Sequence, residues 1–134
     1  MSQTNFFVQC LDCGNTEPFR VNQTACSHCG SNWREVHYDL PKVKEIFERS
    51  LPERPFNLWR YRELLPITEY LPYLSMGEGG TPLIHANNLG MMLGCPTLFI
   101  KDERQGPTNS FKDRQAAVAI AAMKEASVTE AVLA

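Results

Sequence analysis

Four of the five cysteines stand in two CxxC pairs, a spacing typical of metal sites. The pairs are CLDC at residues 10–13 and CSHC at residues 26–29, separated by twelve residues. Two residues between cysteines let both thiolates turn toward one point, and a spacer of hairpin length brings the second pair opposite the first. A glycine follows each pair, Gly14 and Gly30, and supplies the positive φ that such turns often need. The pattern predicts one structural zinc ion with closed coordination and no catalytic role. The predicted ligands are Cys10, Cys13, Cys26 and Cys29.

Other interpretations of the cysteines stay open. A redox dithiol explains one CxxC pair better than two, and spacing alone does not separate iron from zinc. His28 lies inside the second pair. We interpret it as a bystander, because four cysteines already complete a tetrahedral site. Cys95 has no partner pair and is interpreted as a small core residue.

A lysine stands just before one of the most apolar stretches of the chain. The segment GPTNSFKDRQ at residues 106–115 leads into AAVAIAAM at residues 116–123. Ser110 and Asp113 have the spacing of a capping box, which predicts a helix from about residue 111 to residue 126 with Lys112 in its first turn. A cation is disfavoured at this positive end of a helix by roughly 0.3–1 kcal/mol.

The apolar stretch after Lys112 has no polar face, as is typical of a helix buried within a larger domain. Its first turn is therefore expected to lie in a crevice. Desolvation and the helix dipole would both favour a neutral, nucleophilic amine, which Schiff-base chemistry requires. The alternative is an exposed lysine paired with Asp113 or Glu103.

The elements that position these residues fall into three parts. Residues 1–38 are rich in cysteine, carry β-prone pieces at 6–9 and 33–38, and are predicted to form a zinc ribbon. Residues 39–76 contain five prolines and two short helical patterns, so they are predicted to form a helical connecting arm.

Residues 77–134 alternate strand and helix signals. Strands are expected at 83–84, 97–100 and 131–134, the second of them buried, and helices at 87–93 and about 111–126. This alternation predicts the α/β class with parallel pairing. Because two or three strands leave sheet faces and edges uncovered, the segment is interpreted as the beginning of a truncated domain.

Charge and hydropathy exclude several classes of partner. The chain has 13 Lys and Arg against 15 Asp and Glu, and residues 1–40 carry two arginines against four acids, so no nucleic-acid partner is expected. No basic signal sequence and no apolar run of about 20 residues occurs, so no membrane association is expected. The predicted partner is a small molecule, and the predicted location is the cytoplasm.

The lysine segment and two motifs before it also carry a family resemblance. PTNSFKDR at 107–114, IKDE at 100–103 and GEGGTPL at 77–83 resemble the threonine synthase branch of the fold type II pyridoxal-phosphate enzymes, the tryptophan synthase β-like family. The resemblance implies a three-layer α/β/α catalytic domain that binds pyridoxal 5'-phosphate through Lys112, with Phe111 against the pyridine ring. Many members also have an N-terminal zinc ribbon.

Three positions depart from the family pattern NPTGSFKDRG. Gly106 replaces asparagine, Asn109 replaces the first glycine, and Gln115 replaces the last one. The change at 109 leaves the substrate open.

By resemblance, the full-length protein is expected to be a homodimeric carbon–oxygen lyase acting on a small-molecule amino-acid substrate. The expected activity is threonine synthase, which makes threonine and phosphate from O-phosphohomoserine in threonine biosynthesis. The alternative within the family is a serine or threonine dehydratase, and the non-enzyme alternative is a zinc-ribbon interaction module. The 134-residue chain alone is expected to be inactive.

Overall fold

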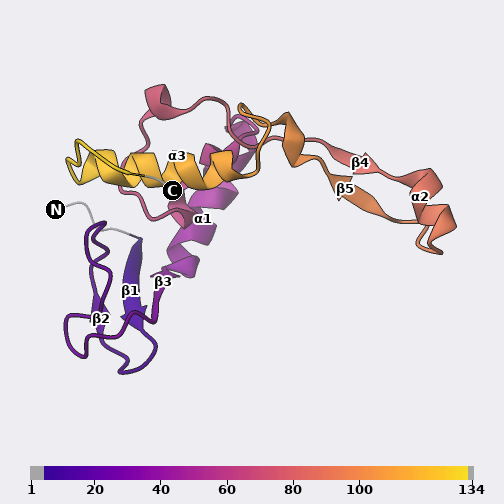
Figure 1. The fold of residues 1–134 in the computed structure, drawn as a ribbon. Coiled ribbons are helices and arrows are strands. Elements are labelled where there is room, and N and C mark those ends of the chain that lie inside the picture. The colour runs from indigo at the N-terminus through magenta and orange to yellow at the C-terminus, as the bar shows by residue number, and fades with distance from the viewer. Residues whose placement is uncertain (1–4, 133–134) are drawn as a thin grey trace.

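The N-terminal part of the computed structural model, which describes residues 5–132, is a small antiparallel sheet (Figure 1). Its strands are β1 (Phe6–Cys10), β2 (Thr16–Glu17) and β3 (Arg34–Tyr38), in the order β2-β1-β3. Side chains alternate along β1, so that Phe6, Val8 and Cys10 are buried. The strands predicted at 6–9 and 33–38 are confirmed to within one residue.

The connecting arm begins with α1 (Leu40–Ser50), where Asp39 caps the helix by accepting a 3.1 Å hydrogen bond from the Lys42 amide. Three 3-10 helices follow: η1 (Leu51–Glu53), η2 (Leu58–Leu64) and η3 (Pro72–Leu74). The second predicted helix is thus a 3-10 segment with a kink at Tyr61. Short helical turns are expected where prolines recur, because proline cannot donate the hydrogen bond that continues a helix.

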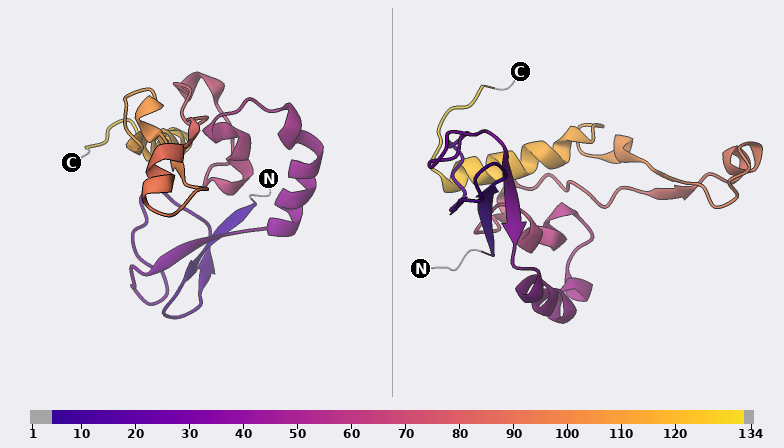
Figure 2. Two further views of the ribbon diagram at one scale, coloured as in Figure 1. Left: turned by 90° about the vertical axis from the view of Figure 1, so that its right-hand side faces the viewer. Right: turned by 90° about the horizontal axis from the view of Figure 1, so that it is seen from below.

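Strand β4 (Leu83–His85) and strand β5 (Phe99–Lys101) form a two-stranded ribbon with helix α2 (Asn87–Met92) at its tip. The ribbon projects away from the other elements (Figures 1 and 2). It is antiparallel, with Ile84 opposite Ile100, so the prediction of parallel pairing is wrong. The six-residue α2 is too short to carry the chain back along the sheet, and the chain returns beside β4 instead.

The strand predicted at 97–100 is also not buried. Phe99 and Ile100 are 52% and 44% exposed, and the residues of β4 are exposed as well. The uncovered faces expected for residues 77–134 are therefore present in the described structure.

Helix η4 (Glu103–Gln105) and helix α3 (Lys112–Glu125) complete the described elements. The helix predicted over about 111–126 is confirmed to within one residue. Only one side of α3 is covered: Ala117, Ala121 and Ala122 are buried, whereas Ile120 is 46% exposed. Of the strand expected at 131–134, residues 131–132 have no strand structure, and residues 133–134 lie outside the described range.

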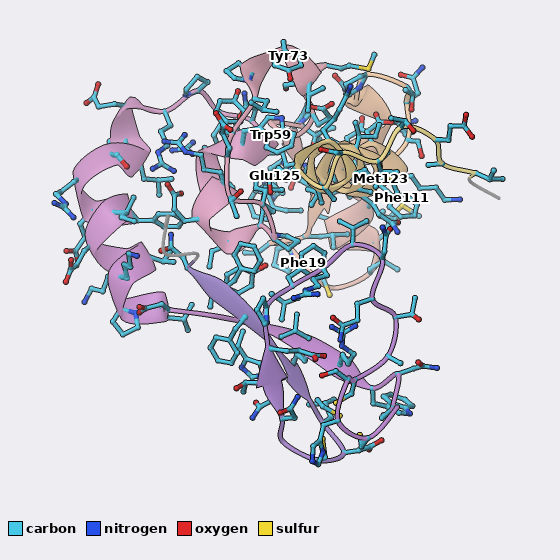
Figure 3. The ribbon with its side chains drawn as sticks, turned by 90° about the vertical axis from the view of Figure 1, so that its left-hand side faces the viewer. Phe19, Trp59, Tyr73, Phe111, Met123 and Glu125 are labelled. Atoms are coloured by element: carbon cyan, nitrogen blue, oxygen red, sulfur yellow. The ribbon has the colours of Figure 1, made fainter. Side chains whose placement is uncertain are left out.

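The covered side of α3 packs on the arm and on the cysteine-rich part. Trp59 and Ile67 form a core with the three buried alanines, and Phe19 packs against this core from the loop after β2 (Figure 3). Glu125, near the end of α3, accepts hydrogen bonds from the amides of Thr68 (2.8 Å) and Glu69 (2.6 Å). Within residues 5–132, no helix is long and apolar enough to cross a membrane.

Candidate functional sites

The four paired cysteines converge on one point. Their sulfur atoms all lie within 4.8 Å of one another. The Cys10 and Cys29 sulfurs are 3.6 Å apart, and the Cys13 and Cys26 sulfurs are 3.7 Å apart. Zn–S bonds of about 2.3 Å at tetrahedral angles place sulfurs about 3.8 Å apart. The cluster therefore has the donor atoms and spacing to hold one tetrahedral metal ion.

Two equivalent backbone turns produce this convergence. The Gly14 amide donates to the Cys10 carbonyl, and the Gly30 amide donates to the Cys26 carbonyl, both at 2.9 Å. Both glycines have positive φ, 72° and 76°, as predicted from their place after each pair. Each turn brings the two cysteines of its pair together.

Backbone amides favour a thiolate at Cys26. The Cys29 and His28 amides lower the pKa of this thiol to about 6, and the His28 amide lies 3.4 Å from its sulfur. Among residues 5–132, the cluster of possible metal ligands contains the four cysteines and not His28, which agrees with its interpretation as a bystander. Cys95 is exposed, so its interpretation as a core residue is wrong.

Lys112 is the first residue of α3, and its side chain is free. The residue is exposed, and none of the hydrogen bonds or ion pairs among the described residues involves its amine. Phe111 beside it is 66% exposed. The expectation that this turn lies in a crevice is therefore wrong for the described structure, because the elements around it leave this end of α3 uncovered. The alternative is confirmed in part: Lys112 is exposed, but among the described residues it forms no ion pair with Asp113 or Glu103, whose carboxylates bind other groups.

The loop before α3 is closed by Asp113. Its carboxylate accepts hydrogen bonds from the Thr108 hydroxyl and, at 3.0 Å, from the Thr108 amide. The Ser110 hydroxyl oxygen accepts from the Lys112 amide at 3.2 Å. The predicted reciprocal capping box between Ser110 and Asp113 is therefore wrong, because Asp113 binds Thr108 instead.

Backbone conformation at Asn109 and close packing at Gly106 are consistent with two of the departures from the family pattern. Asn109 has a φ of 59°, in the left-handed region that glycine favours and that asparagine tolerates best among other residues. At Gly106, an added Cβ would lie 2.7 Å from an Asp113 carboxylate oxygen. Glycine at 106 and asparagine at 109 thus suit the loop that Asp113 closes.

A network joins the three sequence motifs near Lys112. The Arg114 guanidinium donates two hydrogen bonds to the Glu103 carboxylate, at 2.8 and 2.9 Å, and its contact with the Thr81 hydroxyl oxygen is 3.3 Å. The Thr81 hydroxyl donates to Glu103 at 2.6 Å. Arg114 and then Thr81 lower the pKa of Glu103 to about 2. Sequence reasoning missed this network, although each member lies in one of the three quoted motifs.

The GEGGTP turn packs tightly on the arm beside this network. An added Cβ at Gly79 would lie 2.5 Å from the Leu58 amide nitrogen and 3.1 Å from the Arg114 guanidinium. Glu78 between the glycines is buried and accepts a 3.2 Å hydrogen bond from the Trp59 indole. Glycine is therefore required at 79 by close approach of backbone as well as by its φ of 89°.

The second lysine of the region is engaged. The Lys101 amine donates to the Thr81 carbonyl. Residues 100–104 and 109–111 line an open hollow of about 430 Å³ between η4 and the loop before α3. Of the two lysines, only Lys112 offers an amine without a partner among the described residues.

The family model described as pyridoxal-phosphate dependent enzyme matches residues 74–134. The threonine synthase of Methanocaldococcus jannaschii is 37% identical over 121 residues, which are 90% of this chain and 29% of the relative. That of Methanosarcina acetivorans is 34% identical over 115 residues, 86% of this chain and 27% of the relative. That of Halalkalibacterium halodurans is 47% identical over 68 residues, 51% of this chain and 19% of the relative.

The chain thus spans less than a third of the length of these curated relatives. No solved structure matches it at comparable significance. The first two alignments extend well beyond residues 74–134, so the similarity also includes much of the chain before the family match.

Proposed function

We propose that the protein is a pyridoxal-phosphate dependent lyase in which Lys112 binds the cofactor, because the family model described as pyridoxal-phosphate dependent enzyme matches residues 74–134. The proposed reaction is that of threonine synthase: O-phosphohomoserine and water give threonine and phosphate. The similarity to three curated threonine synthases supports this choice of substrate. The observation that carries the role of Lys112 is its free amine at the start of α3, whereas the amine of Lys101 is engaged.

The residues at this end of α3 suit a group that reacts through an amine. Lys112 would hold the aldehyde carbon of the cofactor, and the exposed ring of Phe111 is available to lie against its pyridine. When bound, pyridoxal phosphate supplies an electron sink for the carbanion at the substrate α-carbon. Once the substrate amine has displaced it, Lys112 Nζ would accept and return protons at the substrate carbons.

We also propose that Cys10, Cys13, Cys26 and Cys29 bind one structural zinc ion. The sulfur separations of 3.6 and 3.7 Å support a tetrahedral site of this size. Four thiolates leave no position for water or substrate, so the metal would stabilise the small β1–β3 sheet and take no part in the reaction.

Activity of the full product of the gene tests the proposed reaction. Phosphate release and threonine formation are measured with O-phosphohomoserine, and ammonia and keto-acid formation with threonine and serine. Lys112→Ala should abolish threonine formation. Lys124→Ala, which removes an exposed lysine near the other end of the same helix, should leave it unchanged.

Two results would overturn parts of this proposal. Keto acid and ammonia from threonine, with no phosphate from O-phosphohomoserine, would assign a dehydratase and exclude the synthase. Full activity and an unchanged absorbance of bound pyridoxal phosphate in Lys112→Ala would exclude the role of Lys112. Zinc content is tested separately, and well below about one ion per chain would exclude the structural metal.

A further inference from the structure

We propose that Thr81, Glu103 and Arg114 are positioning residues that fix the first turn of α3 and thereby aim Lys112. This inference rests on the proposed role of Lys112. The three residues are called the clamp below. They come from the turn before β4, from η4 after β5, and from α3, so they connect three separate segments of the chain.

Within the clamp, the Glu103 carboxylate stabilises the charge of Arg114. Arg114 stands two residues after Lys112, in the first helical turn, where the helix dipole disfavours a cation. The two-pronged contact with Glu103 is the strong form of a carboxylate–guanidinium pair, and it compensates this cost. Because Glu103 is engaged by Arg114 and Thr81, it is not available to pair with the Lys112 amine.

Thr81 and Glu103 are joined to the hydrogen-bonded β4–β5 ribbon. Thr81 and Glu103 flank the paired strands, and the Asp102 amide donates to the Pro82 carbonyl at 3.0 Å, which continues the pairing between them. The Thr81 hydroxyl then donates to Glu103 and accepts from Arg114. The start of α3 is therefore tied to a hydrogen-bonded ribbon outside the helix.

The other side of Lys112 is held by the loop. Asp113 closes residues 106–110 through Thr108, and Ser110 accepts from the Lys112 amide. The backbone of Lys112 lies between these two ties, while its side chain remains free. Fixing the backbone that carries a reactive amine lowers part of the entropy lost when the amine meets its partner.

A neighbouring ion pair offers a matched control. Arg104 contacts Asp102 with two hydrogen bonds, at 2.8 and 3.0 Å, so it has the same chemistry as the clamp. This pair joins residues two apart in sequence, and its arginine side chain is 85% exposed. It makes no connection to α3 among the described contacts.

The experiment adds pyridoxal phosphate to the full gene product and treats samples with borohydride at successive times. Peptide mass spectrometry then measures how fast Lys112 acquires the reduced cofactor. Arg114→Met, Glu103→Gln and Thr81→Val should each slow this rate on the order of tenfold. Arg104→Met should change it by less than about twofold, because the hydrogen bonds of this pair join Arg104 to Asp102 and not to α3. The charge exchange Glu103→Arg with Arg114→Glu should recover most of the rate lost in Arg114→Met.

Hydrogen exchange without cofactor gives an independent second readout. Arg114→Met should speed exchange of the amides in residues 113–117 and leave those of β1 unchanged. Wild-type rates in the clamp variants, or unchanged exchange in residues 113–117, would overturn the clamp while leaving the role of Lys112 intact. If no reduced cofactor is found on Lys112 of the wild type, the proposed function is overturned instead. Hydrogen exchange of residues 113–117 would still test the clamp in that case.

Discussion

Alanine at Gly80 should destabilise the GEGGTP turn through two separate effects. The φ of Gly80 is 63°, a region that costs an L residue about 1–2 kcal/mol. The added Cβ would lie 2.2 Å from the Phe56 carbonyl oxygen, and real contacts of this kind stay beyond 3.0 Å, so backbone would have to move by roughly 0.8 Å. Overpacking of this size costs about 1–3 kcal/mol, so the free energy of unfolding should fall by about 2–5 kcal/mol.

Gly77→Ala is the matched control for this prediction. Gly77 belongs to the same turn and has a φ of 91°, but its added Cβ would meet nothing within 4 Å. The free energy of unfolding of Gly77→Ala should fall only by the cost of the positive φ, about 1–2 kcal/mol. Urea unfolding of the two variants measures the difference. Equal losses at Gly77 and Gly80 would refute the close packing of this turn on the arm.

Three further predictions concern the metal site, the loop and the clamp. Cys26→Ser should reduce bound zinc from about one ion per chain to near zero and lower the melting temperature, whereas Cys95→Ser should change neither. Elemental analysis measures the zinc and thermal melts measure the stability. Zinc retained in Cys26→Ser would contradict the metal site. Asn109→Gly should change the free energy of unfolding by less than about 0.5 kcal/mol, and Asn109→Ala should lower it by about 1 kcal/mol, because the φ of residue 109 is 59°. Equal effects of the two substitutions in urea unfolding would contradict the left-handed conformation. Folding lowers the pKa of Glu103 from 4.5 to about 2. Ionised Glu103 therefore stabilises the folded protein fully at pH values above 4.5, and this contribution to the free energy of unfolding is lost as the pH falls toward 2. Unfolding followed over this pH range should show a larger loss for wild type than for Glu103→Gln, and parallel profiles would contradict the ion pair.

The cysteine-rich part could be predicted closely from sequence because its signals are local. The spacing of each CxxC pair and the glycine after it specify a turn within four or five residues. One of the two helical patterns expected within residues 39–76 is α1, which Asp39 caps and whose Val43 is buried. Local patterns of this kind do not depend on distant segments.

Pairing and contacts between distant segments could not be predicted in the same way. Alternating strand and helix signals around β4 and β5 suggested a parallel pair, because the pattern does not say that a helix of six residues turns the chain back. The clamp is likewise invisible to periodicity, since Glu103 and Arg114 are eleven residues apart and meet Thr81 only in the folded chain. Exposure of Lys112 also depends on which elements cover α3, and sequence patterns alone did not determine that.

The most direct test of the central proposal is to locate the cofactor on the protein. The full gene product is incubated with pyridoxal phosphate, reduced with borohydride, digested and analysed by mass spectrometry. The proposal predicts a phosphopyridoxyl group on Lys112 that is absent from Lys112→Ala. Labelling of Lys101 or Lys124, with Lys112 unmodified in the wild type, would contradict it.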